Sequence, residues 1–310
     1  MLAFSIEASH KRGMGHLYRS ITISKYLRYK SIFFINKNLK SLEILKKNKI
    51  KYKIIDRTKK INFKNLVNKY SVKIWINDKL ETNKLEGQKI SSLVSFVTFD
   101  DWGQGSKFAK LNISPLYFGK KKLFGKKVFT GIKYLPLKKE NFKYARIRKK
   151  KINKILISMG GSDTYNVTLK ILDYLKKKDI TSTVICGPAS KLNNAIKKYK
   201  KDFRIKYNVK NIFKEFSNHD ILICGGGMTP FEAASTGLPS IVIASEPFEI
   251  PVCKKLQKIG ISKFIGYRKK INFKKIDLNL DIKNMSNICI NRIKMHGLKN
   301  IKKNIDSLLR

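Results

Sequence analysis

The chain has 310 residues, a formal net charge of +47, and 42% hydrophobic and 11% aromatic residues. This length and apolar fraction are typical of a globular protein of about two domains, each large enough for its own core. No apolar run approaches the roughly 20 residues that a membrane helix needs, so we expect no membrane-spanning segment.

The start of the chain and its cysteines indicate the cellular compartment. The first residues, MLAFSIEASHKRG, lack a basic segment followed by a long apolar core, so we expect no signal peptide and a cytoplasmic location. Cys186, Cys224, Cys253 and Cys289 show no C-x-x-C spacing, and two of them lie within or at the ends of apolar runs. We therefore expect buried thiols rather than a disulfide framework or a zinc site.

The positive charge is distributed along the whole chain, with short runs at 120–122, 148–151 and 176–178. Lys, Asn and Ile are all abundant and share adenine- and thymine-rich codons, so we interpret the charge as genome bias and expect no dedicated nucleic-acid partner. A basic nucleic-acid-binding protein is a distant alternative, which predicts lysines grouped on one face with interleaved aromatics. The charge still favours anionic substrates and weak association with an acidic membrane surface.

In the first half, apolar runs alternate with segments of helical periodicity. Expected strands are 2–8, 31–35, 52–55, 72–76 and 93–99, and expected helices are 17–29, 39–48, 62–69 and 81–91. Shorter strands in 111–137 close this half. The alternation predicts an α/β fold with a parallel, doubly wound sheet.

The second half repeats this architecture after a charged segment, 143–154, that we interpret as a linker. Expected strands are 155–160, 182–186, 203–208, 221–223 and 241–244, and expected helices are 165–177, 190–199 and 211–217, with a last one reaching Gln257. We predict an N-terminal Rossmann-like domain, 1–145, and a C-terminal one, 152–283. Residues 284–310 are predicted as terminal helices, with packing on the N-terminal domain as one option.

A glycine turn, Gly225 to Gly227, interrupts the apolar run that starts at Ile221, and Thr229 opens a helix after it. Glycines let a backbone approach a ligand, and the free N–H groups of a helix start attract an anion. Glu232 lies on the first helical turn, where its carboxylate can accept hydrogen bonds from ribose hydroxyls. The alternative is that these glycines only permit a tight strand-to-helix turn.

A similar turn, SMGGSDTYN at 158–166, lies between another strand and helix. Ser162 or Thr164 can cap the helix and contact a phosphate, although an ordinary capped helix is the alternative. Since no G-K-[ST] follows, we exclude a Walker A loop. The predicted diphosphate contacts of both turns are Gly160, Gly161, Ser162, Gly226, Gly227, Met228 and Thr229.

The first loop contains Gly13, Gly15 and His16, followed by Arg19. The third glycine position of a dinucleotide fingerprint is Tyr18 here, which disfavours a nicotinamide or flavin enzyme. A neutral His16 at the carboxyl end of the first strand can take a proton from water or a sugar hydroxyl. The alternative is that His16 caps its helix.

Acidic residues end two further strands. Asp78 follows one strand, and Asp100 and Asp101 follow the next. They are candidates for lining an acceptor pocket, binding a cation or capping a turn. Since adjacent residues of a strand point to opposite faces, Asp100 and Asp101 are not expected to act as one acid/base pair.

Together these motifs resemble the GT-B superfamily of glycosyltransferases, within it the group of the spore-coat polysaccharide proteins and the UDP-sugar hydrolase of pseudaminic acid biosynthesis. GMGHLYRS resembles the group's G-x-G-H-x-x-R loop, INDKLET and FDDWGQG its next two strand ends, and TGIKYLPLKKENF the segment closing the first domain. ISMGGSDTYNVT and CGGGMTPFEAASTGLP are similar to its nucleotide-binding turns. The resemblance covers most of residues 1–260, and the lipid II N-acetylglucosaminyltransferase is a more distant relative.

The resemblance implies two Rossmann-like domains facing across a cleft, with a UDP-sugar held mainly by the second and no metal or cofactor. It implies His16 as the base for inverting attack of water on the anomeric carbon, and Gly13, Gly15, Arg19, Asp78, Asp100, Asp101 and Glu232 among the substrate-binding residues. An inverting glycosyltransferase with a glycan or lipid-linked acceptor is the alternative. The hydrolase carries an aromatic hydroxyl where this chain has Asp78 and Lys79, so INDKLET is closer to the spore-coat type.

Overall fold

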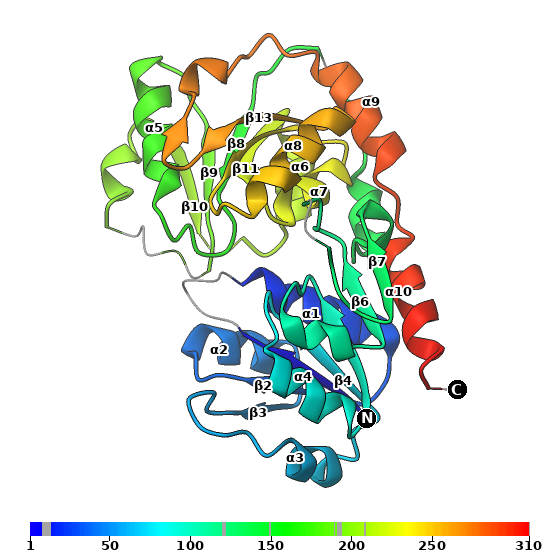
Figure 1. The fold of residues 1–310 in the computed structure, drawn as a ribbon. Coiled ribbons are helices and arrows are strands. Elements are labelled where there is room, and N and C mark those ends of the chain that lie inside the picture. The colour runs from blue at the N-terminus through cyan, green and yellow to red at the C-terminus, as the bar shows by residue number, and fades with distance from the viewer. Residues whose placement is uncertain are drawn as a thin grey trace. The chain divides into compact units, whose positions relative to one another are not determined.

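The protein, a computed structural model, is described at residues 1–7, 14–119, 122–148, 150–188, 190, 194–207 and 209–309. It forms two compact units (Figure 1). Unit 1 comprises Met1–Pro136 and His296–Arg310, and unit 2 comprises Leu137–Met295. The charged segment 143–154 therefore belongs to unit 2, and residues 284–310 are divided between the units.

Unit 1 is built on a seven-stranded parallel sheet with the order β3-β2-β1-β4-β5-β6-β7. The strands are β1 (Leu2–Ile6), β2 (Ser31–Ile35), β3 (Tyr52–Ile54), β4 (Ile74–Asp78), β5 (Ser95–Phe99), β6 (Leu111–Ser114) and β7 (Lys127–Thr130). The helices are α1 (Gly15–Leu27), α2 (Leu39–Lys47), α3 (Phe63–Lys69), α4 (Lys84–Ser91) and α10 (Gly297–Asp306), with short 3₁₀ turns η1 (Gln104–Phe108) and η2 (Ile132–Tyr134).

Alternation of apolar residues along these strands supplies a core on both faces of the sheet. Ala3, Phe34 and Trp75 pack on one face with Phe63 of α3 and Ile90 of α4. The Phe34 and Trp75 rings stack with centroids 4.9 Å apart. Strands β1, β2, β4 and β5 are buried at nearly every position, as is typical of the inner strands of a parallel sheet.

Unit 2 has a sheet of the order β10-β9-β8-β11-β12-β13-β14, parallel except for β14. The strands are β8 (Ile155–Ser158), β9 (Thr183–Cys186), β10 (Arg204–Tyr207), β11 (Ile221–Gly225), β12 (Ser240–Ala244), β13 (Ser262–Tyr267) and β14 (Lys270–Ile271). The helices are α5 (Val167–Lys177), α6 (Ile212–Asn218), α7 (Thr229–Ala234), α8 (Glu249–Ile259) and α9 (Ile282–Arg292), with 3₁₀ turns η3 (Lys139–Tyr144), η4 (Lys197–Tyr199) and η5 (Phe273–Lys275).

The two doubly wound sheets confirm the predicted fold class. In each, the strand order reverses at one point, between β1 and β4 in unit 1 and between β8 and β11 in unit 2. The loops at the carboxyl ends of such strands diverge and leave room for a ligand. His16 follows β1, Asp78 ends β4, and the two glycine turns follow β8 and β11, so the predicted site residues lie at these reversal points.

Several element boundaries differ from the predicted ones. The strand predicted at 72–76 is β4, Ile74–Asp78, because pairing with both β1 and β5 keeps polar Asn77 and Asp78 extended. Where we predict a helix at 190–199, the described residues form only η4. Strands β13 and β14 were not predicted, since Gly266 and charged residues interrupt the apolar pattern there.

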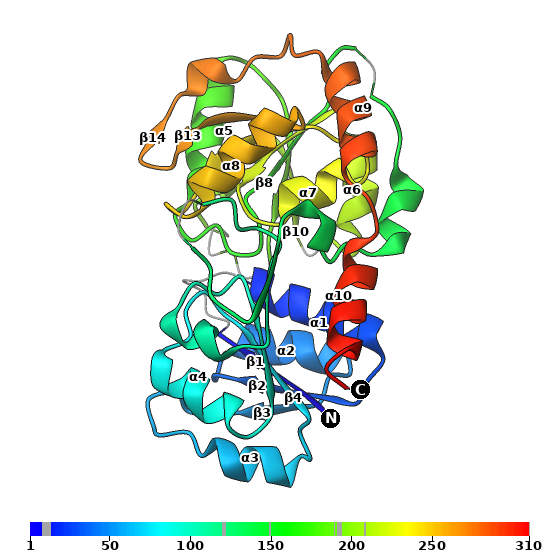
Figure 2. The ribbon, with the colours of Figure 1, turned by 45° about the vertical axis from the view of Figure 1, so that its right-hand side comes forward.

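Helix α10 packs in unit 1 against α1 and η2 (Figure 2). Tyr29 Oη donates to Asp306 Oδ1 at 2.9 Å. A Cβ on Gly297 would lie 1.8 Å from the Leu135 carbonyl oxygen, so only glycine allows this approach at the start of the helix. Helix α9 instead belongs to unit 2 and contacts α7.

All four cysteines are free and buried, which confirms that prediction. Burial raises the pKa of the Cys289 thiol to about 12, so it is an inert, uncharged side chain. Among the helices of the described residues, none combines the length and the apolar character that crossing a lipid bilayer requires.

Arg148 lies in the segment that we predicted as a linker, but its side chain is buried at 5% exposure. Its guanidinium donates to the carbonyls of Phe216 (2.7 Å) and Ser217 (3.0 Å) in α6 and to that of Thr236 (3.5 Å), after α7. A cation there satisfies carbonyls at helix ends and opposes the negative end of the helix dipole. Burial lowers the pKa of Arg148 to about 10 but leaves it charged at neutral pH.

We expect Arg148→Met to lower the free energy of unfolding of unit 2 by about 2 to 3 kcal/mol, because three buried carbonyl oxygens lose their donor. Arg146→Met is the matched control, since the Arg146 side chain is exposed. Urea unfolding monitored by far-UV circular dichroism measures the stability of both variants. Equal stability of the two variants would contradict a capping role for Arg148.

Candidate functional site

Three chain segments bring a cluster of polar side chains together in unit 1. His16, Arg19 and Ser20 lie on one face of α1 at the i, i+3 and i+4 spacing of neighbours on a helix. Asp78 ends β4 next to them, and Asp100 follows β5. The structure therefore joins three separate sequence motifs at the carboxyl edge of one sheet.

His16 contacts Asp78 through one ring nitrogen. His16 Nδ1 lies 2.7 Å from Asp78 Oδ1, and the His16 side chain is 16% exposed. A carboxylate accepts but does not donate, so this contact requires a proton on Nδ1 and leaves a lone pair on Nε2. An imidazole held in this tautomer can accept a proton at Nε2.

Asp78 is a buried carboxylate whose two oxygens are both occupied. Besides His16, it accepts hydrogen bonds from Arg19 Nε at 3.1 Å, from Arg19 Nη2 and from Ser20 Oγ at 2.6 Å. Burial alone would raise the pKa of Asp78, but the Arg19 guanidinium and His16 hold it well below its usual range. Its oxygens thus contact His16, Arg19 and Ser20, and the predicted substrate contact of Asp78 stays a prediction.

Arg19 is also buried, and it bridges two carboxylates. Its Nη1 pairs with Asp100 Oδ2, while Nε and Nη2 pair with Asp78. Burial opposes the charge, yet these two carboxylates raise the pKa of Arg19 above its usual value. The structure pairs Arg19 and Asp100 with each other, and the predicted substrate contacts of both residues stay predictions.

Asp101 lies outside this cluster, on the opposite side of its strand end. Its oxygens accept the N–H groups of Thr82 (3.0 Å) and Gly103 (2.8 Å) and the Thr82 hydroxyl. Its side chain is fully buried, and its predicted substrate contact stays a prediction. Asp100 and Asp101 meet different partners, but both lie after β5 and Asp100 has a left-handed φ of +48, so strand alternation is not the reason.

Of the predicted glycines in the first loop, Gly13 lies outside the described residues. Gly15 is the first residue of α1, and a Cβ there would meet no atom within 4 Å. Met14 occupies the N-cap position without a side-chain cap bond, so the alternative that His16 caps its helix is wrong.

In unit 2 the first glycine turn, after β8, is capped by a residue that we did not predict. Asp163 accepts the N–H groups of Val167 and Thr168, both at 2.9 Å, whereas Ser162 Oγ contacts Thr164 Oγ1 at 3.1 Å. Capping by Ser162 or Thr164 is therefore wrong. Gly160 has φ +82 and open space at its Cβ position, so its backbone stays accessible to a ligand.

Gly187, which follows β9, explains how this turn packs. A Cβ there would lie 2.3 Å from the Gly160 carbonyl oxygen and 2.5 Å from that of Gly161. Glycine at 187 is thus required by packing against the turn and was not singled out from the sequence. Its signal in the sequence is a glycine directly after the apolar run TVIC.

The three glycines after β11 have different surroundings. A Cβ on Gly226 would lie 2.6 Å from Cys253 Sγ and 3.0 Å from Glu249 Cβ, so this glycine permits α8 to pack closely. The Glu249 carboxylate also accepts the Gly226 N–H and the Ser245 N–H, the latter at 2.6 Å. Gly227 has no atom within 4 Å of its Cβ position. Gly226 thus has a packing role, which is the alternative to ligand binding, whereas the backbone at Gly227 has open space beside it.

Met228 and Thr229 form the start of α7, where the Met228 carbonyl accepts the N–H groups of Phe231 and Glu232. Glu232 is on the first turn of this helix, as predicted. Burial raises the pKa of Glu232 to about 7, against a smaller opposing effect of Lys138. The carboxyl group is therefore partly protonated at neutral pH and can accept or donate a hydrogen bond.

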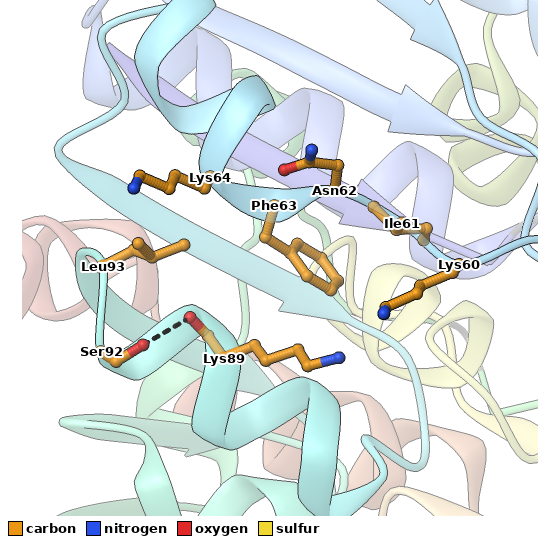
Figure 3. A pocket seen from close by; sticks show the side chains of 8 residues that line it. All are labelled: Lys60, Ile61, Asn62, Phe63, Lys64, Lys89, Ser92 and Leu93. Carbon is orange, nitrogen blue, oxygen red and sulfur yellow. Dashed lines mark hydrogen bonds between the residues drawn. The ribbon is translucent and has the colours of Figure 1, made fainter.

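A pocket of about 640 Å³ lies elsewhere in unit 1, between α3 and α4 (Figure 3). Lys60, Lys64 and Lys89 line it, and the Phe63 ring lies between the two helices. None of the predicted site residues is among those that line it. In the described part of the chain, no three His, Cys, Asp or Glu side chains gather where they could hold a metal ion.

No protein-family model matches the chain. Over 268 residues it is 28% identical to the uncharacterized protein MJ1062 of Methanocaldococcus jannaschii, a match that covers 78% of this chain and 55% of that protein. The chain thus spans about half the length of this curated relative.

Solved structures match almost the whole chain. MurG of Acinetobacter baumannii is 15% identical with a TM-score of 0.68, covering 99% of each chain. Spinosyn rhamnosyltransferase SpnG complexed with thymidine diphosphate is 11% identical with a TM-score of 0.64, covering 98% of this chain and 99% of that one. UDP-GlcNAc 2-epimerase from Neisseria meningitidis bound to UDP-GlcNAc is 14% identical with a TM-score of 0.57, covering 100% and 99%. The chain has the GT-B fold.

We expect Gly226→Ala to destabilise unit 2 by about 1 to 3 kcal/mol, because the added methyl overlaps Cys253 and Glu249. Gly227→Ala is the matched control, since the same methyl enters open space. Thermal unfolding of the two variants measures the difference. A Gly226→Ala variant as stable as Gly227→Ala would show that α8 does not pack on this turn as described.

Stability should also depend on the protonation of Asp101. Burial raises the pKa of Asp101 to about 6 from a usual value of 3.8, so between these values the folded protein retains a proton that the unfolded chain has released. Stability of the natural protein should fall, relative to Asp101→Asn, by roughly 2 to 3 kcal/mol as the pH rises from 4 to above 6. Urea unfolding of both proteins across this range measures it, and a pH-independent difference would contradict the raised pKa.

Proposed function

We propose that the chain is a nucleotide-sugar enzyme of the glycosyltransferase type, which transfers the sugar of a UDP-sugar to a hydroxyl acceptor with inversion. The observation that carries this proposal is the His16–Asp78 contact at the strand-order reversal of unit 1. It leaves Nε2 of a partly exposed imidazole free to act as a base. The proposal gives unit 1 the base and unit 2 the nucleotide diphosphate.

In the proposed reaction, the acceptor hydroxyl attacks the anomeric carbon while its proton moves to His16 Nε2. The bond between the anomeric carbon and the diphosphate oxygen breaks, and UDP leaves with that electron pair. Asp78 stabilises the imidazolium that forms, because its negative charge lies 2.7 Å from Nδ1. General-base assistance of this kind contributes roughly 10²- to 10⁴-fold to a rate.

The leaving diphosphate is proposed to rest on main-chain donors of unit 2. Gly160 and Gly227 supply open backbone, and the starts of α5 and α7 carry partial positive charge. Asp163 and Glu249 already accept several N–H groups at these turns. The phosphate oxygens are therefore proposed to accept from the N–H groups of 160–162 and 227–229. Glu232 is proposed to hold the ribose hydroxyls.

The transferase is favoured over the hydrolase that we first expected from the sequence. Of the three structural neighbours described above, SpnG is named a rhamnosyltransferase, and none is named a hydrolase. Hydrolysis is the second candidate, because GMGHLYRS resembles the loop of the pseudaminic acid pathway hydrolase and the same imidazole can activate water. The two reactions differ only in the acceptor that reaches Nε2.

Incubation of the purified protein with UDP-sugars tests the proposal. We expect slow UDP release with water alone and faster release when a glycan or lipid-linked acceptor is added. His16→Gln should lower kcat by roughly 10²- to 10⁴-fold, because the base is lost, while UDP binding measured by calorimetry stays unchanged.

His296→Gln is the matched control, since His296 is an exposed residue at the start of α10. Rapid UDP release without any acceptor would support the hydrolase instead. Failure to bind UDP or a UDP-sugar, or full activity of His16→Gln, would contradict the proposed function.

A further inference from the structure

We propose that Asp100 is a positioning residue that selects the reactive tautomer of His16 by anchoring Arg19. The catalytic consequence rests on the proposed function, whereas the effect on the tautomer does not. The observations that carry it are the contacts among four side chains, His16, Arg19, Asp78 and Asp100.

Two donors compete at the His16–Asp78 contact. Arg19 Nη2 donates to Asp78 Oδ1, the same oxygen that accepts from His16 Nδ1, and it lies only 3.1 Å from that nitrogen. Arg19 Nη2 always carries protons, so it can bond to Nδ1 only if Nδ1 has none. In that second tautomer the proton is on Nε2, and the ring cannot accept another there.

The position of the guanidinium decides between these tautomers. Arg19 Nε and Nη2 form a two-pronged contact with Asp78, and Nη1 pairs with Asp100. Because the guanidinium is planar and rigid, pairing at Nη1 fixes the direction of Nη2. Without the Asp100 carboxylate, the guanidinium is free to pivot and Nη2 can turn from Asp78 Oδ1 to His16 Nδ1.

Asp100 is itself held firmly in this position. Its φ of +48 is in the left-handed region, which few residues other than glycine adopt, and such a conformation persists where the surrounding structure enforces it. Its N–H donates to the Ile113 carbonyl at 3.1 Å, and its Oδ1 accepts the Leu116 N–H at 3.2 Å. The Asp100 side chain is 7% exposed, so its carboxylate contacts groups inside unit 1 rather than solvent.

The charges of the cluster agree with this role. Asp78 and Asp100 carry two negative charges against the single positive charge of Arg19, so the cluster has a net charge of −1 while His16 is neutral. A proton taken up at Nε2 brings the cluster to neutrality. Asp100 thus supports protonation of the ring as well as its starting tautomer.

Nitrogen-15 NMR of histidine-labelled protein without substrate tests this directly, with His16→Gln used to assign the His16 signals. In the natural protein we expect Nδ1 protonated and Nε2 unprotonated. In Asp100→Asn we expect the Nε2-protonated tautomer to become populated, and kcat to fall roughly 10- to 100-fold with the KM for the UDP-sugar unchanged within about twofold. Asp100→Gly, which suits the left-handed backbone, is the second variant if Asp100→Asn does not fold.

Two further variants distinguish positioning from a general structural effect. Asp101→Asn, next in the chain and facing away from the cluster, should leave the His16 nitrogen signals unchanged. The double variant Arg19→Met/Asp100→Asn removes the competing donor together with its anchor, so it should restore the Nδ1-protonated tautomer.

Several outcomes would overturn the proposal: unchanged nitrogen signals in folded Asp100→Asn or Asp100→Gly, an equal change in Asp101→Asn, or no restoration in the double variant. A shift of the tautomer as expected in a protein that releases no UDP would instead support the positioning role and contradict the proposed function.

Discussion

The buried carboxylate of Asp78 is the group on which the candidate site depends. It fixes the ring of His16, pairs with Arg19 and accepts from Ser20, so removing it would leave a buried cation and an unanchored imidazole. Arg19 and His16 lower its pKa against the effect of burial. Arg19 also pairs with Asp100. The cluster is therefore one interdependent network, and the His16 side chain is 16% exposed.

In unit 2 the protein's own carboxylates use some of the main-chain donors that the glycine turns present. Asp163 accepts two N–H groups at the start of α5, and Glu249 accepts those of Ser245 and Gly226. These contacts hold the turns in shape before any ligand arrives, which limits the reorganisation needed on binding. The N–H groups bound by Asp163 and Glu249 are occupied, so the proposed diphosphate would use other main-chain donors of these turns.

The fold and the chemistry rest on different observations. The GT-B fold follows from the two sheets and from structural neighbours of 15% identity or less, and similarity at that level carries the fold without the reaction. The proposed reaction instead follows from where one imidazole, one carboxylate and a set of open glycines lie. The basic composition adds an electrostatic preference for an anionic ligand without specifying it.

The sequence by itself determined the alternation of strands and helices and the candidates His16, Asp78, Gly160 and Gly227, because apolar periodicity and glycine turns are local signals. It also separated Asp100 from Asp101, although strand alternation is not the reason, since both lie after β5 and Asp100 has a left-handed φ. Only the tertiary structure decided which acidic residue meets His16, because Arg19, Asp78 and Asp100 are separated by dozens of residues. Likewise, the packing role of Gly226 depends on Cys253 and Glu249 of another helix, which no local pattern reveals.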